Sequence, residues 1–149
     1  GTFTGYSAIC LARGLKPGGR LITLEMNDEL KYISEKYFRL AGLDKTIDQR
    51  TGNALEIIPT LDMHFDLIFL DGEKTEYLHY YEQVIDKLNP GGYIVADNVL
   101  WDGKVISGDP EDDPETKGIK VFNEFVREDQ RVENVILNIR DGLSLIRKL

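Results

Sequence analysis

The segment Phe65-Asp66-Leu67-Ile68-Phe69-Leu70-Asp71 has the pattern of a buried strand followed by a carboxylate. Its first six residues are apolar except for Asp66, which is typical of a strand buried on both faces of a parallel sheet. A second run of this kind, Tyr93–Ala96, is followed by Asp97 and Asn98. The two runs predict a parallel sheet with acidic or amide side chains where its strands end.

Helical patterns alternate with strand patterns on both sides of this segment. Further strands are expected over Arg20–Leu24, Ile47–Arg50, Val132–Ile139 and Leu143–Arg147. Helices are expected over Tyr6–Arg13, from Asp28 as N-cap to Gly42, over Thr75–Leu88 and over Thr116–Glu128. Asp141-Gly142 is a strong hairpin signal. The alternation predicts an α/β fold, with a mostly parallel sheet, helices on both faces and a C-terminal antiparallel hairpin.

Length and charge exclude several classes of protein. The 149 residues suit one domain, 1–149, and 18 Lys+Arg against 26 Asp+Glu give a net charge of −8 without a basic cluster, so we expect no nucleic-acid partner. No apolar run approaches the roughly 20 residues that span a bilayer, so we expect no membrane partner. Cys10 is the single cysteine, which excludes an internal disulfide and favours a cytoplasmic location. It falls on a predicted buried helix face, as an inert core thiol would.

The first residues resemble a nucleotide-binding glycine turn. In Gly1-Thr2-Phe3-Thr4-Gly5, however, Phe3 stands where the dinucleotide fingerprint has glycine, and Tyr6 stands at the next such position. Bulky side chains there would block a pyrophosphate, so we expect a nucleoside without phosphates. Glu25 lies 20 residues after Gly5 at a predicted strand end, where such folds place an acid that binds ribose hydroxyls. A ribose without a pyrophosphate indicates S-adenosylmethionine. The alternative is a plain turn and a solvated Glu25.

Acidic and amide residues at two further strand ends suit a metal. Asp71, Asp97 and Asn98 offer only oxygen ligands, which fit a hard cation such as Mg²⁺, with Mn²⁺ or Ca²⁺ as alternatives. Lys74 follows Asp71 by three residues, so its amine could reach the same pocket, where burial and a cation would favour the neutral form that accepts a proton. The alternative is that Asp71 caps a helix, Lys74 is an exposed helix residue and Asp97-Asn98 is a turn.

Together these residues resemble a known family over essentially the whole chain. The most specific segments are Gly1-Thr2-Phe3-Thr4-Gly5-Tyr6-Ser7, Phe69-Leu70-Asp71-Gly72-Glu73-Lys74, Asp97-Asn98-Val99-Leu100-Trp101 and Arg140-Asp141-Gly142-Leu143. They are similar to the cation-dependent O-methyltransferases of the caffeoyl-CoA and catechol type, which use S-adenosylmethionine. The resemblance implies a Rossmann-like methyltransferase fold and a homodimer. Family members also carry N-terminal helices and a first strand in mid-sheet, so we expect a longer natural protein and a gap in the sheet.

The resemblance implies a role for each candidate residue. Asp71, Asp97 and Asn98 would bind the metal, and Lys74 with Asp71 would carry catalysis, Lys74 as general base. Glu73 stands where the family commonly has Asp. The expected contacts to S-adenosylmethionine are Gly1, Thr2, Phe3, Gly5, Ser7, Glu25, Met26, Gly52, Asn53, Ala54, Asp71 and Glu73.

The expected reaction is methyl transfer to a hydroxyl of a small, catechol-like aromatic acceptor. Trp101 and Tyr77 are candidate walls for that acceptor, with a core role as the alternative for each. Five acids within Asp109–Glu115 predict a negative rim that favours an uncharged or cationic catechol over a coenzyme A ester. A solvated loop pointing away is the alternative. Two other functions stay open: a non-catalytic S-adenosylmethionine-binding relative, and a nucleotide-dependent oxidoreductase, against which Phe3 and Tyr6 argue.

Overall fold

The computed structural model describes residues 1–107 and 112–149. The chain divides into two compact units, residues 1–60 and residues 61–149. Each unit holds one hydrogen-bonded sheet, so the described strands form a two-stranded and a four-stranded sheet.

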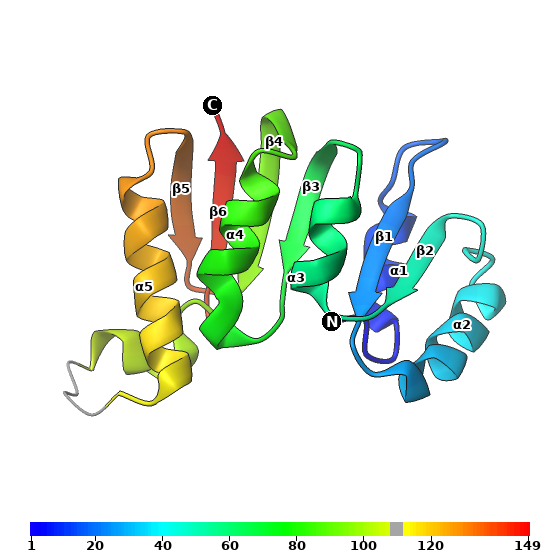
Figure 1. The fold of residues 1–149 in the computed structure, drawn as a ribbon, viewed down its shortest axis with the longest axis horizontal. Coiled ribbons are helices and arrows are strands. Elements are labelled where there is room, and N and C mark those ends of the chain that lie inside the picture. Colours follow the sequence, from blue (N-terminus) through cyan, green and yellow to red (C-terminus); the bar gives the residue numbers. More distant parts are fainter. Residues whose placement is uncertain (108–111) are drawn as a thin grey trace. The chain divides into compact units, whose positions relative to one another are not determined.

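Unit 1 is a short α/β layer built on a parallel strand pair (Figure 1). Its elements are α1 (Tyr6–Arg13), β1 (Leu21–Glu25), η1 (Asp28–Leu30), α2 (Lys31–Leu40), β2 (Ile47–Thr51), α3 (Ala54–Ile57) and η2 (Ile58–Thr60). β1 and β2 pair in register from Leu21 with Ile47 to Glu25 with Thr51. Their carboxyl ends therefore lie at one edge.

The core of unit 1 joins both longer helices to the strands. Ala8 and Ala12 of α1 are buried with Phe38 of α2 and Ile47 of β2. Cys10, predicted to be buried, is exposed, because it lies two residues from each of these alanines and thus on the opposite side of α1. A second difference concerns the start of the next helix, where Asn27 rather than Asp28 accepts the capping hydrogen bond, from the Glu29 amide.

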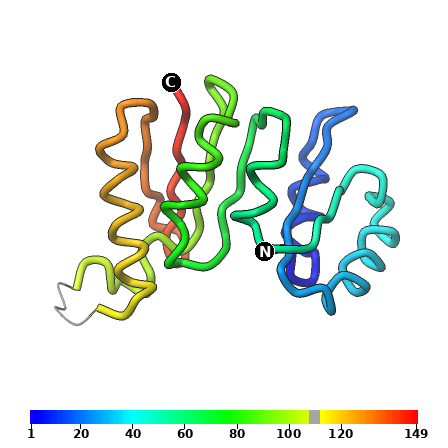
Figure 2. The backbone as a smooth tube through the Cα atoms, viewed as in Figure 1, coloured from blue at the N-terminus to red at the C-terminus, as the bar shows by residue number. Residues whose placement is uncertain are grey.

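Unit 2 carries a mixed sheet in the order β3-β4-β6-β5. Its elements are β3 (Phe65–Leu70), η3 (Lys74–Glu76), α4 (Tyr77–Ile85), β4 (Leu88–Asp97), η4 (Trp101–Ile106), α5 (Pro114–Glu128), β5 (Val132–Leu137) and β6 (Leu143–Lys148). β3 and β4 are parallel, and β6 runs antiparallel to both of its neighbours. Figure 2 follows the backbone from α5 into the predicted β5–β6 hairpin, which is confirmed.

One face of this sheet lies under α4 and α5, as Figure 1 shows. Ile94 and Ile146 from the strands are fully buried there with Tyr77, Tyr81 and Phe122 from the helices. Phe122 meets both tyrosine rings edge to face, at 5.4 and 6.0 Å between centroids. Burial of apolar and aromatic side chains on this face is what holds the helices to the sheet.

The other face of the unit 2 sheet differs from the prediction. Leu67 is 49% exposed and Tyr93 is 43% exposed, so the expectation that β3 is buried on both faces is wrong for this structure. The physical reason is that α4 and α5 both pack on the opposite face of the sheet. β4 is also longer than predicted: Leu88 already pairs with Phe65, and the register shifts before Leu67 pairs with Tyr93.

None of the helices in the described residues is long and apolar enough to cross a membrane.

Candidate functional site

The edge of unit 1 where β1 and β2 end gathers most of the residues expected to bind the cofactor. Glu25 is its centre, because its carboxylate accepts hydrogen bonds from the amides of Phe3 (2.8 Å) and Asn27 (2.9 Å). Its main-chain carbonyl accepts from the Gly52 amide at 2.8 Å. The predicted joint role of the glycine turn and Glu25 therefore has a geometric basis: one side chain ties the turn to the end of β1.

The electrostatics of Glu25 favour a carboxylate. Partial burial opposes its ionisation, but hydrogen bonds from the Asn27 and Phe3 amides outweigh burial and hold the pKa of Glu25 below its ordinary value. Glu25 is therefore charged at neutral pH, as an acceptor for ribose hydroxyls should be.

The other predicted residues of this edge differ in what they can offer. Thr2 is buried, and its hydroxyl bonds to that of Thr23 at 2.8 Å. Its amide donates to the Leu24 carbonyl and its carbonyl accepts from the Gly5 amide, so Thr2 holds the turn in place with all of its polar groups. Asn53 uses its side chain to cap α3, where it accepts from the Leu55 amide. The remaining residues lie on the turn, at the start of α1 or at the strand ends, with Phe3, Ser7 and Met26 exposed: Gly1, Phe3, Gly5, Ser7, Met26, Gly52 and Ala54.

In unit 2 the ends of β3 and β4 bring the predicted metal ligands to one level. Leu70 pairs with Ala96, so Asp71 and Asp97 leave two adjacent parallel strands side by side, about 5 Å apart by ordinary strand spacing. Asn98 has a left-handed backbone (φ 58°), a conformation that Asn tolerates better than most residues. The main-chain N–H of Asn98 donates a hydrogen bond to the Asp97 carboxylate at 2.7 Å, which fixes the direction of that carboxylate.

Lys74 lies in the turn between β3 and α4 and is only 7% exposed. Its ammonium donates to Asp71 Oδ1 at 3.1 Å and to the Tyr77 hydroxyl at 2.6 Å. The alternative in which Lys74 is an ordinary exposed helix residue is therefore wrong. Glu73, next to it, is exposed on the same turn.

The two aromatic residues proposed to line an acceptor pocket behave differently. Tyr77 has no exposed surface, so its ring cannot wall an acceptor in this structure, and the core alternative is correct. Trp101 is half-buried with its ring centre 5.8 Å from the Lys74 nitrogen. Its indole N–H is buried and has no hydrogen-bond partner among the described residues. The role of Trp101 as a wall of the acceptor stays a prediction.

The side chains at this edge offer the kind of ligand atoms that a hard cation prefers. They comprise two carboxylates on adjacent strands and one amide, all oxygen ligands. Within residues 1–107 and 112–149 no group of three or more His, Cys, Asp or Glu side chains is placed to hold a metal ion. The side-chain amide oxygen of Asn98 would therefore have to complete a metal site here, together with acceptor oxygens or water.

Three hydrogen bonds that the sequence did not predict hold the segment after Asp97 in place. The Val99 and Leu100 amides donate to the main-chain carbonyls of Gly142 and Asp141. Gly142 has φ 86°, and a Cβ there would lie 2.5 Å from Leu100 Cγ, so only glycine fits. Asn123 of α5 donates to the Val99 carbonyl at 2.8 Å.

Gly118 of α5 sets the position of the Lys74 turn. A Cβ at this glycine would lie 2.5 Å from the Lys74 carbonyl oxygen and 2.9 Å from Thr75 Cα. Helix and turn can approach this closely only because residue 118 has no side chain. In the sequence, the indication of this contact is that Gly118 stands alone inside a helical pattern, where a packing reason for glycine is common.

Gly118→Ala should therefore destabilise the protein by about 1 to 3 kcal/mol through overpacking, although Gly→Ala inside a helix ordinarily stabilises by about 0.5 to 1 kcal/mol. Urea unfolding followed by circular dichroism measures the change. Lys117→Ala, at the neighbouring exposed position, is the control and should stay within about 0.5 kcal/mol. An unchanged or increased stability of Gly118→Ala would show that the backbone at Lys74 and Thr75 can move away to make room for the methyl group.

The acidic segment has a structural role in its described part. Asp112 pairs with Lys120 at 2.6 Å, and Asp113 pairs with Lys104 at 2.9 Å. Asp113 also caps α5 by accepting from the Thr116 amide. Asp109, Pro110 and Glu111 lie outside the described residues, so the predicted negative rim is untested there.

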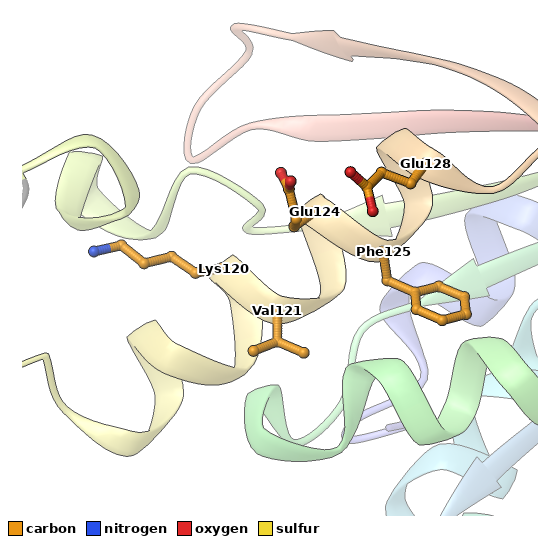
Figure 3. Close-up of a pocket in the computed structure, with 5 residues that line it drawn as sticks. All are labelled: Lys120, Val121, Glu124, Phe125 and Glu128. Atoms are coloured by element: carbon orange, nitrogen blue, oxygen red, sulfur yellow. The ribbon is translucent and has the colours of Figure 1, made fainter.

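Two hollows in the surface of the described residues lie away from these strand ends. One follows the outer side of α5 and is lined by Lys120, Val121, Glu124, Phe125 and Glu128, whose side chains Figure 3 shows along the helix. A second adjoins it at Asp129 and Arg131. Neither includes a predicted site residue.

Comparison with known proteins gives a consistent result. The O-methyltransferase family model matches residues 1–149. The chain is 37% identical to the catechol O-methyltransferase of Niastella koreensis, over 97% of this chain and 69% of that protein. It is 35% identical to the caffeoyl-CoA O-methyltransferase of Pinus taeda, over 100% of this chain and 62% of that protein.

A solved structure agrees with these relatives. The O-methyltransferase from Bacillus cereus in complex with SAH has a TM-score of 0.93 at 33% identity, covering 100% of this chain and 71% of that chain. The chain thus spans 62 to 71% of the length of these three proteins. On the match of the family model and of these relatives, the chain belongs to the O-methyltransferase family.

Proposed function

We propose that this protein transfers the methyl group of S-adenosylmethionine to a hydroxyl of a small catechol-like acceptor and that the transfer needs a divalent cation. The observation that carries the proposal is the buried Lys74 amine, held 3.1 Å from Asp71 Oδ1 at the level where β3 and β4 end. A buried amine beside carboxylates on adjacent strands suits removal of a proton from an acceptor hydroxyl. A protein that only binds S-adenosylmethionine has no need of it.

The edge of unit 1 supports the cofactor part of the proposal. Glu25 is a charged acceptor that already orders the turn Gly1–Gly5, so hydrogen bonds from ribose hydroxyls need little further ordering. The SAH bound to the Bacillus cereus relative fits this interpretation. The other proposed contacts to S-adenosylmethionine are Gly1, Phe3, Gly5, Ser7, Met26, Gly52, Asn53, Ala54, Asp71 and Glu73.

The edge of unit 2 supplies the chemistry in this proposal. Asp71, Asp97 and Asn98 would hold the cation, which would supply Lewis acidity and a template for two neighbouring acceptor oxygens. Lys74 accepts the proton of the reacting hydroxyl, and Asp71 holds the amine in place. Trp101 lines the acceptor beside Lys74.

The test is a turnover assay with S-adenosylmethionine and Mg²⁺, with product identified by mass spectrometry. We expect methylated catechol. Caffeoyl-CoA, compared at low and high salt, tests the prediction that the acidic segment disfavours charged esters, because salt would relieve such repulsion. Tight binding of S-adenosylmethionine without turnover of any phenolic acceptor would favour the non-catalytic alternative, and tight binding of NAD would favour the oxidoreductase.

The homodimer and the cytoplasmic location stay predictions.

Glu25→Ala should weaken S-adenosylmethionine binding about tenfold or more, because charge-assisted hydrogen bonds are worth roughly 1.5 to 3 kcal/mol each. Isothermal titration calorimetry measures the affinity. Since Glu25 also orders Phe3 and Asn27, unfolding is followed in parallel. Glu29→Ala removes an exposed carboxylate nearby and should bind as the unmodified chain does. Unchanged affinity of Glu25→Ala would refute the ribose assignment.

A further inference from the structure

The hydroxyl of Tyr77 makes polar contacts that a purely apolar core role does not explain. Tyr77 is fully buried, and its hydroxyl accepts a hydrogen bond from the Lys74 amine at 2.6 Å. The same hydroxyl donates to the main-chain carbonyl of Asp97 at 3.0 Å. The Leu70 carbonyl lies 3.4 Å away as a second acceptor. The phenol thus connects the end of β3, the end of β4 and the amine.

The ring of Tyr77 is held rigidly, so its hydroxyl is a fixed point. Phe122 of α5 packs edge to face against the ring at 5.4 Å and is itself fully buried. Burial, with the nearby carboxylates of Asp71 and Asp97, raises the pKa of Tyr77 far above its ordinary value. The phenol therefore keeps its proton and always presents one donor, to a main-chain carbonyl, and one acceptor, to Lys74.

Lys74 needs such a fixed partner. A lysine amine sits on a flexible four-carbon stem, and the other partner of Lys74, Asp71, has a side chain that is 44% exposed. An amine held by Asp71 alone would depend on a half-exposed carboxylate that the proposed cation also uses. To accept a proton the amine must be neutral, with two N–H groups and one lone pair. Asp71 and Tyr77 accept the two N–H groups, which leaves the lone pair for the proton of an acceptor hydroxyl.

We propose that Tyr77 is a positioning residue for Lys74: its hydroxyl fixes the amine relative to the Asp97 main chain, at the edge where β3 and β4 end. The inference rests on the proposed function, in which Lys74 accepts the acceptor's proton. Loss of the hydroxyl lets the amine move toward Asp71. The reaction slows because proton transfer requires a correctly placed amine, whereas substrate binding through other groups continues.

The test compares Tyr77→Phe with Tyr81→Phe in the full chain. Tyr81 is a matched control, because it is also fully buried on α4, packs on the same Phe122 at 6.0 Å and donates a hydrogen bond, to Asp129. Both changes remove one buried hydroxyl. We expect only Tyr77→Phe to lower kcat, by about 10- to 100-fold with KM unchanged, since misplacement by about 1 Å costs up to about 100-fold. An unchanged kcat, or an equal loss in Tyr81→Phe, overturns the proposal.

A double-variant cycle shows whether Tyr77 acts through Lys74. We expect Tyr77→Phe to lower kcat in the unmodified chain and to have no further effect on Lys74→Met, because the amine it positions is gone. Equal effects in both backgrounds overturn the positioning role.

The same cycle measured by urea unfolding needs no turnover. The double variant should lose less free energy of unfolding than the sum of the two single losses. Additive losses would show that the Lys74–Tyr77 hydrogen bond does not contribute. If Lys74→Met turns over at the full rate, the proposed function fails separately, and Tyr77 has no amine to position.

Discussion

Lys74→Met should lower kcat by about 10² to 10⁴-fold, the range of a lost general base. Methionine keeps an unbranched apolar stem of similar length in this buried position but cannot accept a proton. The phenol of Tyr77 keeps its donor bond to the Asp97 carbonyl, so the turn should remain folded. The measurement is single-turnover methyl transfer at saturating S-adenosylmethionine and acceptor, which reports the chemical step alone.

Two controls make this result specific. Lys148→Met removes another lysine amine of unit 2, one that donates to the main-chain carbonyls of Ile85 and Leu88, and should leave kcat within about twofold if only the base matters. Calorimetric titration of Lys74→Met with S-adenosylmethionine should give unchanged affinity, because the proposed ribose contact is Glu25. A rate within threefold of the unmodified chain would remove Lys74 from the mechanism.

Asp97→Ala should weaken the affinity for Mg²⁺ by at least about 100-fold and abolish turnover at low Mg²⁺, because even residues that only support a metal ligand are worth about 10- to 100-fold. Excess chelator should abolish the activity of the unmodified chain in the same way. Asp97→Asn is the matched variant: its amide oxygen can still accept from the Asn98 amide, but the charge is gone. Mg²⁺ titrations by calorimetry and by rate give both readouts.

Asn98 ranks below Asp97 in this prediction, since a neutral amide contributes less to holding a cation. Asn98→Ala also strains the backbone, because residue 98 has φ 58°. Asn98→Gly removes the same amide without that strain and separates the two effects. Full activity of the unmodified chain in excess chelator would contradict the cation requirement, and an Asn98→Gly defect larger than that of Asp97→Ala would contradict the ranking.

Local pattern was sufficient for the architecture and for the strand ends at which the candidate residues stand. The run Phe65–Leu70 is a strand with the predicted bounds, and Asp141-Gly142 turns the predicted hairpin. These succeed because the signals are local: strand pattern and turn chemistry act over a few residues. Because the carboxyl ends of parallel strands meet at one edge, Asp71 and Asp97 could also be placed side by side from their positions after two such strands.

Tertiary contacts decided which of these side chains are buried and what they touch. The periodicity could not show that Tyr77 lies beneath Lys74 rather than along an acceptor, because its burial depends on Phe122, 45 residues further on. It could not show that α4 and α5 leave Leu67 exposed. Nor could it show that α5 needs glycine at 118, since that need comes from the backbone of the Lys74 turn. The sequence determined the residue types and the strand ends at which they stand; packing between distant segments determined their burial and orientation, because a side chain's surroundings depend on elements that no local pattern specifies.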